Sequence, residues 1–231
     1  MPAGAMRFVF NCVETAIDVE AGVPRVLEVE NRRLYCRVCR AMARLGEDGE
    51  RDYVNVWDGD ERAPAERSPL VVGNPLALPW EEKRLGGRLP AVMESFLLED
   101  EELRQEIEVA GARLRRVIDR ASFQIEGEYR FDLEWDLPRF LKAYAFSVDR
   151  SEHGAYIESL ISFLDFASDM GFKGVLVFMG LKNFLGENEL NEVYERIFFH
   201  DLKVLLLERE HDLRSFEREV KTYVNLQLLE E

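Results

Sequence analysis

The sequence is poor in residues on which several common protein classes depend. It has three cysteines and three histidines among 231 residues. An odd and small number of cysteines provides no disulfide framework. The histidines, His153, His200 and His211, lie beside charged residues and away from any Gly-x-Ser-x-Gly sequence. A hydrolase built on a histidine base is therefore disfavoured.

Long uncharged stretches are also missing. The longest runs from Ser68 to Trp80, and its 13 residues include three prolines, so it is too short and too interrupted to cross a bilayer. Residues 1–6 lack the basic and then apolar order of a signal peptide. We expect a cytoplasmic protein without a membrane span.

A nucleotide-binding signature is absent as well. No Gly-x4-Gly-Lys-Ser/Thr string occurs. The apolar run Val175–Phe178 is followed by Met179 and Gly180, not by an acidic residue that would hold magnesium. ATP hydrolysis is not expected.

The patterning at the two ends of the chain predicts a mixed α/β fold. Near the carboxyl end, the order strand, helix, strand predicts a parallel pair buried on both faces. A helix is expected over residues 32–45, with Asn31 as its N-cap. The expected strands are 8–13, 15–19, 25–29, 53–57, 69–72, 174–178, 203–207 and 220–228, and the expected helix near the carboxyl end is 187–198.

The middle of the chain has a different pattern. Residues 88–124 contain little turn signal and predict one long helix, followed by another over 153–170. The apolar stripe of the long helix is typical of helix–helix packing. It comprises Leu103, Ile107, Ala110, Leu114, Val117, Ala121 and Ile125. The domain organisation predicted is an α/β domain from residues 1–80 and 155–231, interrupted by a helical insertion at 81–154.

Cys36 and Cys39 form a Cys-x-x-Cys sequence, but they fall in the middle of the expected helix. Redox motifs of this kind open a helix, where the dipole lowers the thiol pKa. A structural zinc site would need a second pair, and Cys12 is the only other cysteine. We interpret both residues as small helix positions.

A short segment is rich in carboxylates that could bind a metal. Calcium takes six to eight oxygen ligands with loose geometry, and a magnesium-dependent nuclease would also use paired carboxylates. A solvated acidic turn explains the same composition. The residues concerned are Glu126, Glu128, Asp132, Glu134 and Asp136.

Basic residues cluster against the overall charge. The chain carries a net charge of −15, yet residues 31–45 carry +5. Arginine suits phosphate recognition, while salt bridges to carboxylates, within the chain or across a subunit interface, would explain the cluster equally well. The arginines are Arg32, Arg33, Arg37, Arg40 and Arg44, and a second set on the long helix comprises Arg113, Arg116 and Arg120.

Several segments taken together resemble the Csn-two family, the small CRISPR-associated proteins of type II-A loci that act in spacer acquisition. None of them is a catalytic signature, so the resemblance depends on their joint order and spacing. They are Val26–Asn31 leading into a helix, Asp132–Asp136, Val175–Leu190 and Lys203–Glu208.

The resemblance implies a degenerate P-loop-like α/β head with an inserted helical leg. It implies a non-catalytic homotetrameric ring that holds double-stranded DNA without sequence preference, favours DNA ends, and is stabilised by Ca²⁺. The other CRISPR adaptation proteins and the effector nuclease of the same locus would be its partners. The arginines above become candidate DNA contacts and the acidic segment a candidate calcium site. The alternatives are a metal-dependent nuclease that uses residues 126–136, and an interaction scaffold that does not bind DNA.

Overall fold

The computed structural model describes most of the chain, and it divides into two compact units. One unit contains residues 1–80 and 150–231, and the other contains residues 81–149. The described residues are 4–11, 13–45, 54–64, 67–127, 137–143, 147–148 and 154–227. Within them, none of the helices is both long and apolar enough to cross a membrane.

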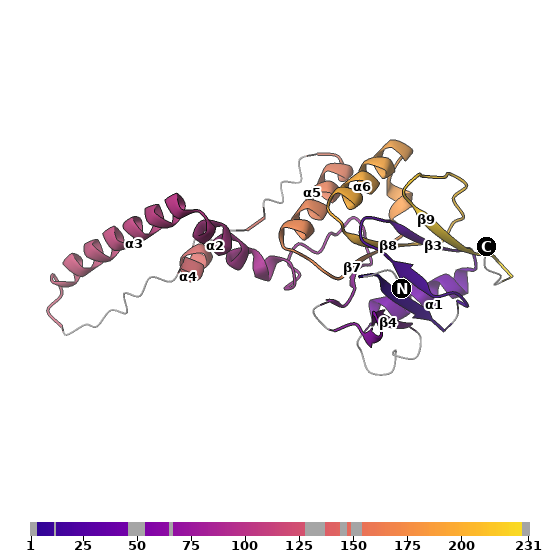
Figure 1. Ribbon diagram of the computed structural model, residues 1–231, viewed down its shortest axis with the longest axis horizontal. Coiled ribbons are helices and arrows are strands. Elements are labelled where there is room, and N and C mark those ends of the chain that lie inside the picture. Colours follow the sequence, from indigo (N-terminus) through magenta and orange to yellow (C-terminus); the bar gives the residue numbers. More distant parts are fainter. Residues whose placement is uncertain are drawn as a thin grey trace. The chain divides into compact units, whose positions relative to one another are not determined.

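The first unit is built on a five-stranded parallel sheet (Figure 1). Each neighbouring pair of its strands is parallel. Strand β3 pairs with both β8 and β9, so segments from the two ends of the chain meet at the centre of the sheet. In spatial order the strands are β6 (Leu70–Val72), β7 (Val175–Met179), β8 (Lys203–Glu208), β3 (Arg25–Val29) and β9 (Val220–Val224).

A second sheet is antiparallel and smaller. Its strands are β2 (Ile17–Val19), β1 (Met6–Phe10), β4 (Val54–Asp58) and β5 (Glu61–Arg62) in spatial order. Its buried side chains share one apolar core with helix α1 (Arg32–Ala43) and with Val177 and Leu205 of the parallel sheet. The other face of the parallel sheet is covered by α5 (Tyr156–Asp169) and α6 (Glu187–Phe199) (Figure 1). The mixed α/β class predicted from the sequence is confirmed.

The strand–helix–strand prediction is confirmed in detail. Strands β7 and β8 are parallel, and they flank α6 in the sequence after a short 3₁₀ helix, η3 (Leu181–Phe184). Val175, Leu176 and Val177 are fully buried, as are Val204 and Leu205. A strand covered on both faces has no solvent-facing positions, which is why these runs are continuously apolar and not alternating.

The second unit is helical. Its elements are η2 (Gly86–Arg88), α2 (Leu89–Glu99), α3 (Glu101–Ser122) and α4 (Leu137–Ala143). The prediction of one continuous helix over residues 88–124 is wrong. The chain leaves the helix at Asp100, whose backbone is extended with φ −90° and ψ 113°, and the Asp100 carboxylate accepts hydrogen bonds from the backbone N–H groups of Glu102 and Leu103. An aspartate that caps its own downstream turn starts a new helix.

Candidate nucleic-acid interface

Helix α1 presents the first arginine cluster, and the sequence explains how it is placed. Asn31 follows β3, and its side-chain oxygen accepts hydrogen bonds of 3.1 Å from the backbone N–H groups of Arg33 and Leu34. This cap fixes where the helix begins. The face toward the core is apolar and buried, and it comprises Leu34, Val38, Ala41 and Met42.

The opposite side of α1 is basic. Arg32, Arg33, Arg37, Arg40 and Arg44 are all exposed to solvent. The first turn contains no acidic residue. Within the described part of the chain, Arg33, Arg37 and Arg40 form no salt bridge. Carboxylates of the described residues therefore do not neutralise these three exposed arginines, and an anion or a second subunit could pair with them.

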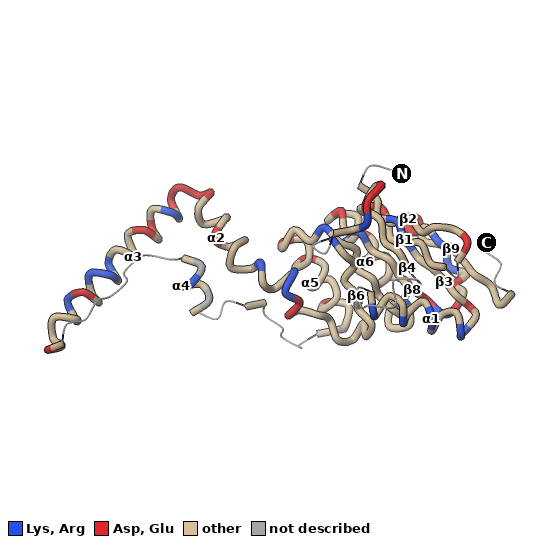
Figure 2. Tube along the Cα trace, turned by 90° about the horizontal axis from the view of Figure 1, so that it is seen from below, with Lys and Arg blue, Asp and Glu red and all other residues tan. Residues whose placement is uncertain are grey.

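The second arginine set lies on α3, in the other unit. Arg113, Arg116 and Arg120 are exposed, and the Nε–H of Arg116 donates to the carbonyl of Ala112 at 3.4 Å. The helix that carries them begins with four glutamates among its first eight residues. This set therefore sits on a helix of mixed charge, whereas α1 has only basic charged residues (Figure 2).

The acidic segment proposed for calcium is described only at its beginning. Glu126 is exposed. Glu128, Asp132, Glu134 and Asp136 lie outside the described residues. Elsewhere, the residues for which a structure is described contain no group of three or more His, Cys, Asp or Glu side chains that could hold a metal ion. The calcium site remains a prediction.

The two cysteines of the Cys-x-x-Cys sequence lie in the middle of α1. Cys36 is exposed and Cys39 is half-buried. Burial raises the pKa of the Cys39 thiol to about 11, although a hydrogen bond with Tyr35 acts in the other direction. A thiol with such a pKa is protonated at neutral pH and is a poor nucleophile. The arrangement does not resemble a redox centre.

Sequence reasoning missed a buried group of charged side chains at the carboxyl ends of β3 and β8. Glu28 is fully buried, and Glu208 is 3% exposed. The amino group of Lys182 lies 2.9 Å from Glu219 Oε2 and 3.4 Å from Asp212 Oδ2. These four acids and the lysine come from four separate parts of the chain.

Further contacts tie the segment 209–219 to the sheet. His211 Nδ1 lies 2.8 Å from Glu28 Oε2. The amino group of Lys221 donates to the backbone carbonyl of Asp212 at 2.7 Å and to that of Arg214. The Tyr194 hydroxyl donates to Glu219 Oε2 at 2.8 Å. The group holds the connection between β8 and β9 against the edge of the sheet.

Burial and pairing move the pKa values of this group in opposite directions. Burial raises the pKa of the Glu208 carboxyl to about 7, and hydrogen bonds from the backbone N–H groups of Lys182 and Leu181 only partly offset it. Burial also acts to raise the pKa of Asp212, but hydrogen bonds from Arg214 and the charge of Lys182 outweigh it and bring that pKa to about 2.

The sequence did contain one signal for this group. Glu28 stands inside the apolar run of β3, and Glu208 ends the apolar run of β8. A charge within a buried strand requires a partner. Its partners, however, are distant in sequence, and spacing could not identify them.

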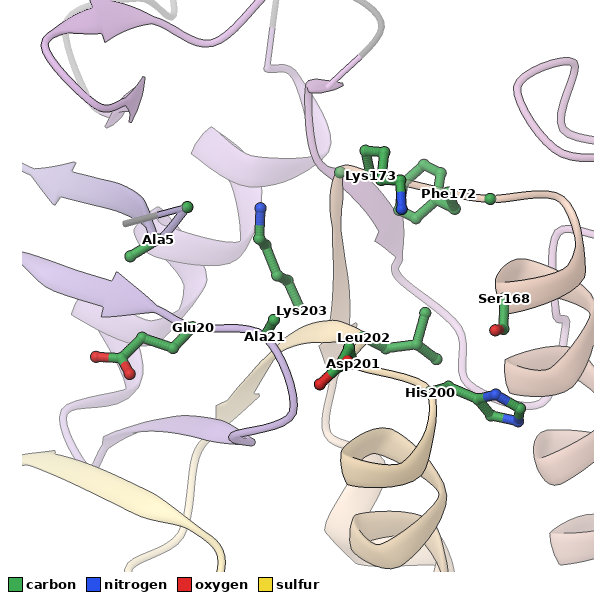
Figure 3. Close-up of a pocket in the computed structure, with 13 residues that line it drawn as sticks. Ala5, Glu20, Ala21, Ser168, Phe172, Lys173, His200, Asp201, Leu202 and Lys203 are labelled. Carbon is green, nitrogen blue, oxygen red and sulfur yellow. The ribbon is translucent and has the colours of Figure 1, made fainter. Parts of the chain in front are cut away.

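A cavity of about 430 Å³ lies at the amino ends of β7 and β8. The side chains that line it come from the ends of β2, β7, β8, α5 and α6, and Figure 3 shows Glu20, Lys203 and His200 pointing in different directions. Burial lowers the pKa of Lys203. The helices α5 and α6 both end at this cavity. The two lysines that line it, Lys173 and Lys203, therefore lie near helix carboxyl ends, where backbone carbonyl groups concentrate negative charge. The charged side chains of the lining do not converge on a common point.

Comparison with known proteins identifies a family. A family model described as "CRISPR-associated protein (Cas_Csn2)" matches residues 51–224, three quarters of the chain. A search of curated proteins finds no match. The matched range contains both arginine-bearing α3 and the parallel strands β6 to β9, but it begins after α1.

Proposed function

The chain belongs to the Cas_Csn2 family of CRISPR-associated proteins, and on that premise we propose that it binds double-stranded DNA without sequence preference. It would act in spacer acquisition and catalyse no reaction itself. The observation that carries this proposal is the exposed arginine row on α1. Four arginines lie in this helix of 12 residues and a fifth, Arg44, is its C-cap, in a chain whose net charge is −15.

The physical basis of binding is the replacement of counterions. Duplex phosphates hold condensed cations, and each arginine that contacts a phosphate releases one. Neutralising about four phosphates gives a slope of about −4 in a plot of log K against log salt concentration. Contacts to the phosphate backbone position a protein without reading bases, which fits a role on DNA of any sequence.

The row on α1 is the first candidate for these contacts. Because α1 precedes the residues matched by the family model, its role is supported by its own charge and exposure. Arg33, Arg37, Arg40 and Arg44 follow one another at intervals of four, three and four residues, so they share one side of the helix. The set Arg113, Arg116 and Arg120 on α3 is the second candidate.

The assembly and the ion are part of the proposal. A homotetrameric ring with arginines on its inner wall would combine an acidic exterior with a basic channel. Calcium bound by residues from Glu126 to Asp136 would stabilise the form that binds DNA. Other adaptation proteins and the effector nuclease of the locus would be its partners.

The test is a gel-shift titration with linear and closed circular duplexes, with calcium or a chelator, over a series of salt concentrations. We expect linear DNA to shift in the presence of calcium, without cleavage, and to bind less tightly as salt rises. The double variant Arg37→Glu/Arg40→Glu should abolish the shift. The matched control Arg62→Glu/Lys173→Glu makes the same change in charge at exposed positions away from α1 and should bind DNA nearly as well as the wild type.

The other outcomes identify the alternatives. No shift at low salt with calcium refutes DNA binding and favours the interaction scaffold, in which Arg37→Glu would disrupt the oligomer. Shortened DNA would favour a metal-dependent nuclease that uses the acidic segment.

A further inference from the structure

Helices α5 and α6 form an acidic layer on the face of the parallel sheet opposite to α1 (Figure 1). Helix α5 contains three acidic residues and no lysine or arginine, and helix α6 contains four glutamates and one arginine. The two helices together carry a charge of −6, whereas the 12 residues of α1 carry +4. The sheet therefore separates two surfaces of opposite charge.

The outward side of this acidic layer is open to solvent. Glu158 and Asp169 of α5 and Glu192 of α6 are exposed. Within the part of the chain that the structure describes, none of these three carboxylates forms a salt bridge, although Asp165 lies 3.4 Å from Arg196. Uncompensated carboxylates repel duplex phosphates and anionic lipids alike. Neither a nucleic acid nor a membrane fits this surface.

Two phenylalanines interrupt the acidic surface at the carboxyl end of α6. Phe198 is 49% exposed and Phe199 is 77% exposed. The exposed positions of α6 recur three and four residues apart, so both rings continue the outward row that contains Glu192 and Glu195. Protein interfaces combine an apolar centre, in which aromatic rings are enriched, with a polar rim. This end of the layer has both parts.

Neighbouring side chains hold the two rings in place. The guanidinium of Arg218 lies 3.9 Å from the centroid of the Phe198 ring, and its Nε–H donates to Glu195 Oε1 at 2.8 Å. The His200 ring packs edge to face on Phe199, with their centroids 5.2 Å apart. Side chains that are ordered before binding lose less conformational entropy in a complex. The rings therefore form a preformed apolar anchor.

We infer that the outer face of α5 and α6 is a docking surface for a different protein with a basic surface, and that Phe199 enters an apolar pocket of that protein. Lysine and arginine side chains around the pocket would lie beside Glu158, Asp169 and Glu192. Proteins that bind nucleic acid carry basic surfaces of this kind. The inference deepens the proposed function, since it gives a site to one of the partners named there, and it rests on that proposal for the choice of probes.

Binding measurements by surface plasmon resonance test this surface. The full chain is titrated against each of the other adaptation proteins and the effector nuclease of the same locus, all purified. We expect at least one of them to bind, and to bind less tightly as salt rises. Phe199→Ala should weaken that binding by about tenfold or more, because the central anchor is lost. Glu158→Lys/Glu192→Lys should weaken it by about tenfold, mainly through slower association.

Matched controls make the same changes elsewhere in the chain. Phe123→Ala removes a ring that is 81% exposed at the end of α3. Glu61→Lys/Glu108→Lys makes the same change in charge at two exposed positions outside α5 and α6. Both controls should bind the partner protein as tightly as the wild type. An unchanged urea midpoint of Phe199→Ala would show that its loss of binding does not come from unfolding.

Three results would overturn the inference. The first is a wild-type chain that binds none of these proteins, and the second is equal weakening by Phe199→Ala and Phe123→Ala. The third is weaker self-association of Glu158→Lys/Glu192→Lys in sedimentation, which would make a second copy of the chain the occupant. The DNA gel shift tests the proposed function separately. A wild type that binds a partner protein here but shifts no DNA would refute DNA binding and leave this docking surface standing.

Discussion

The raised pKa of Glu208 makes a quantitative prediction about folding stability. The carboxyl group ends β8, is 3% exposed and has a pKa of about 7, against an ordinary value of 4.5. The protonated form is therefore favoured in the folded state. Stability linked to this group is present below pH 4.5 and is lost as the pH rises through 7, when the folded protein must hold the charge.

The size of the effect follows from the difference in pKa. About 2.5 pKa units correspond to about 3 kcal/mol of unfolding free energy. The variant Glu208→Gln cannot ionise, so it escapes this loss. Relative to the wild type, its free energy of unfolding should rise by about 3 kcal/mol between pH 4.5 and pH 8. Any constant cost of burying the amide is the same at both pH values and cancels.

The assay is urea denaturation of both proteins at pH 4.5 and pH 8, followed by tryptophan fluorescence. Glu61→Gln, on the exposed strand β5, is the matched control and accounts for the removal of one negative charge from the surface. A difference between Glu208→Gln and wild type that is the same at both pH values would refute the reasoning. Burial would then not govern the ionisation of this carboxyl group.

Three further predictions concern the fold. Lys182→Met should lower the free energy of unfolding at pH 7 by about 3 kcal/mol in urea denaturation, because Glu219 and Asp212 lose their buried partner. A loss below about 1 kcal/mol would mean that Lys221, whose amino group lies 2.9 Å from Glu219 Oε1, is a sufficient partner. Asn31→Ala should cost about 1 kcal/mol through the lost N-cap of α1, and an unchanged urea midpoint would contradict the capping role. In a Cys12→Ser background at pH 8, iodoacetamide should modify Cys36 promptly and Cys39 only after unfolding, as mass spectrometry would show; equal rates would contradict the raised pKa of Cys39.

Local patterns were sufficient to predict much of the fold. Strand β3 was predicted with its observed bounds, because a Gly-x-Pro turn precedes it and an asparagine cap follows it. The parallel pair β7 and β8 followed from continuous apolar runs on either side of α6. The helix expected over residues 32–45 is observed as α1, and its arginines are exposed together because positions three and four apart share one side of a helix.

Other features depend on interactions that sequence spacing does not reveal. The break at Asp100 was missed because aspartate also occurs inside helices, and only its extended backbone shows that it caps α3. The partners of Glu28 come from residues more than 150 positions away along the chain. Their convergence is a product of the sheet order, which places β3 between β8 and β9.

That sheet order has a consequence for how the protein is made. Arg25 of β3 pairs with Leu205 of β8 and with Val220 of β9, so a strand synthesised early lacks both neighbours until the last part of the unit leaves the ribosome. At about 5–20 residues per second, this wait lasts about 10–40 s. The helices α2 and α3, whose contacts are local, can form during that time. In nascent chains that carry only β1 to β4, apolar strands are unpaired and prone to aggregate. We expect chaperones that bind unfolded chains to bind this protein before the parallel sheet is complete.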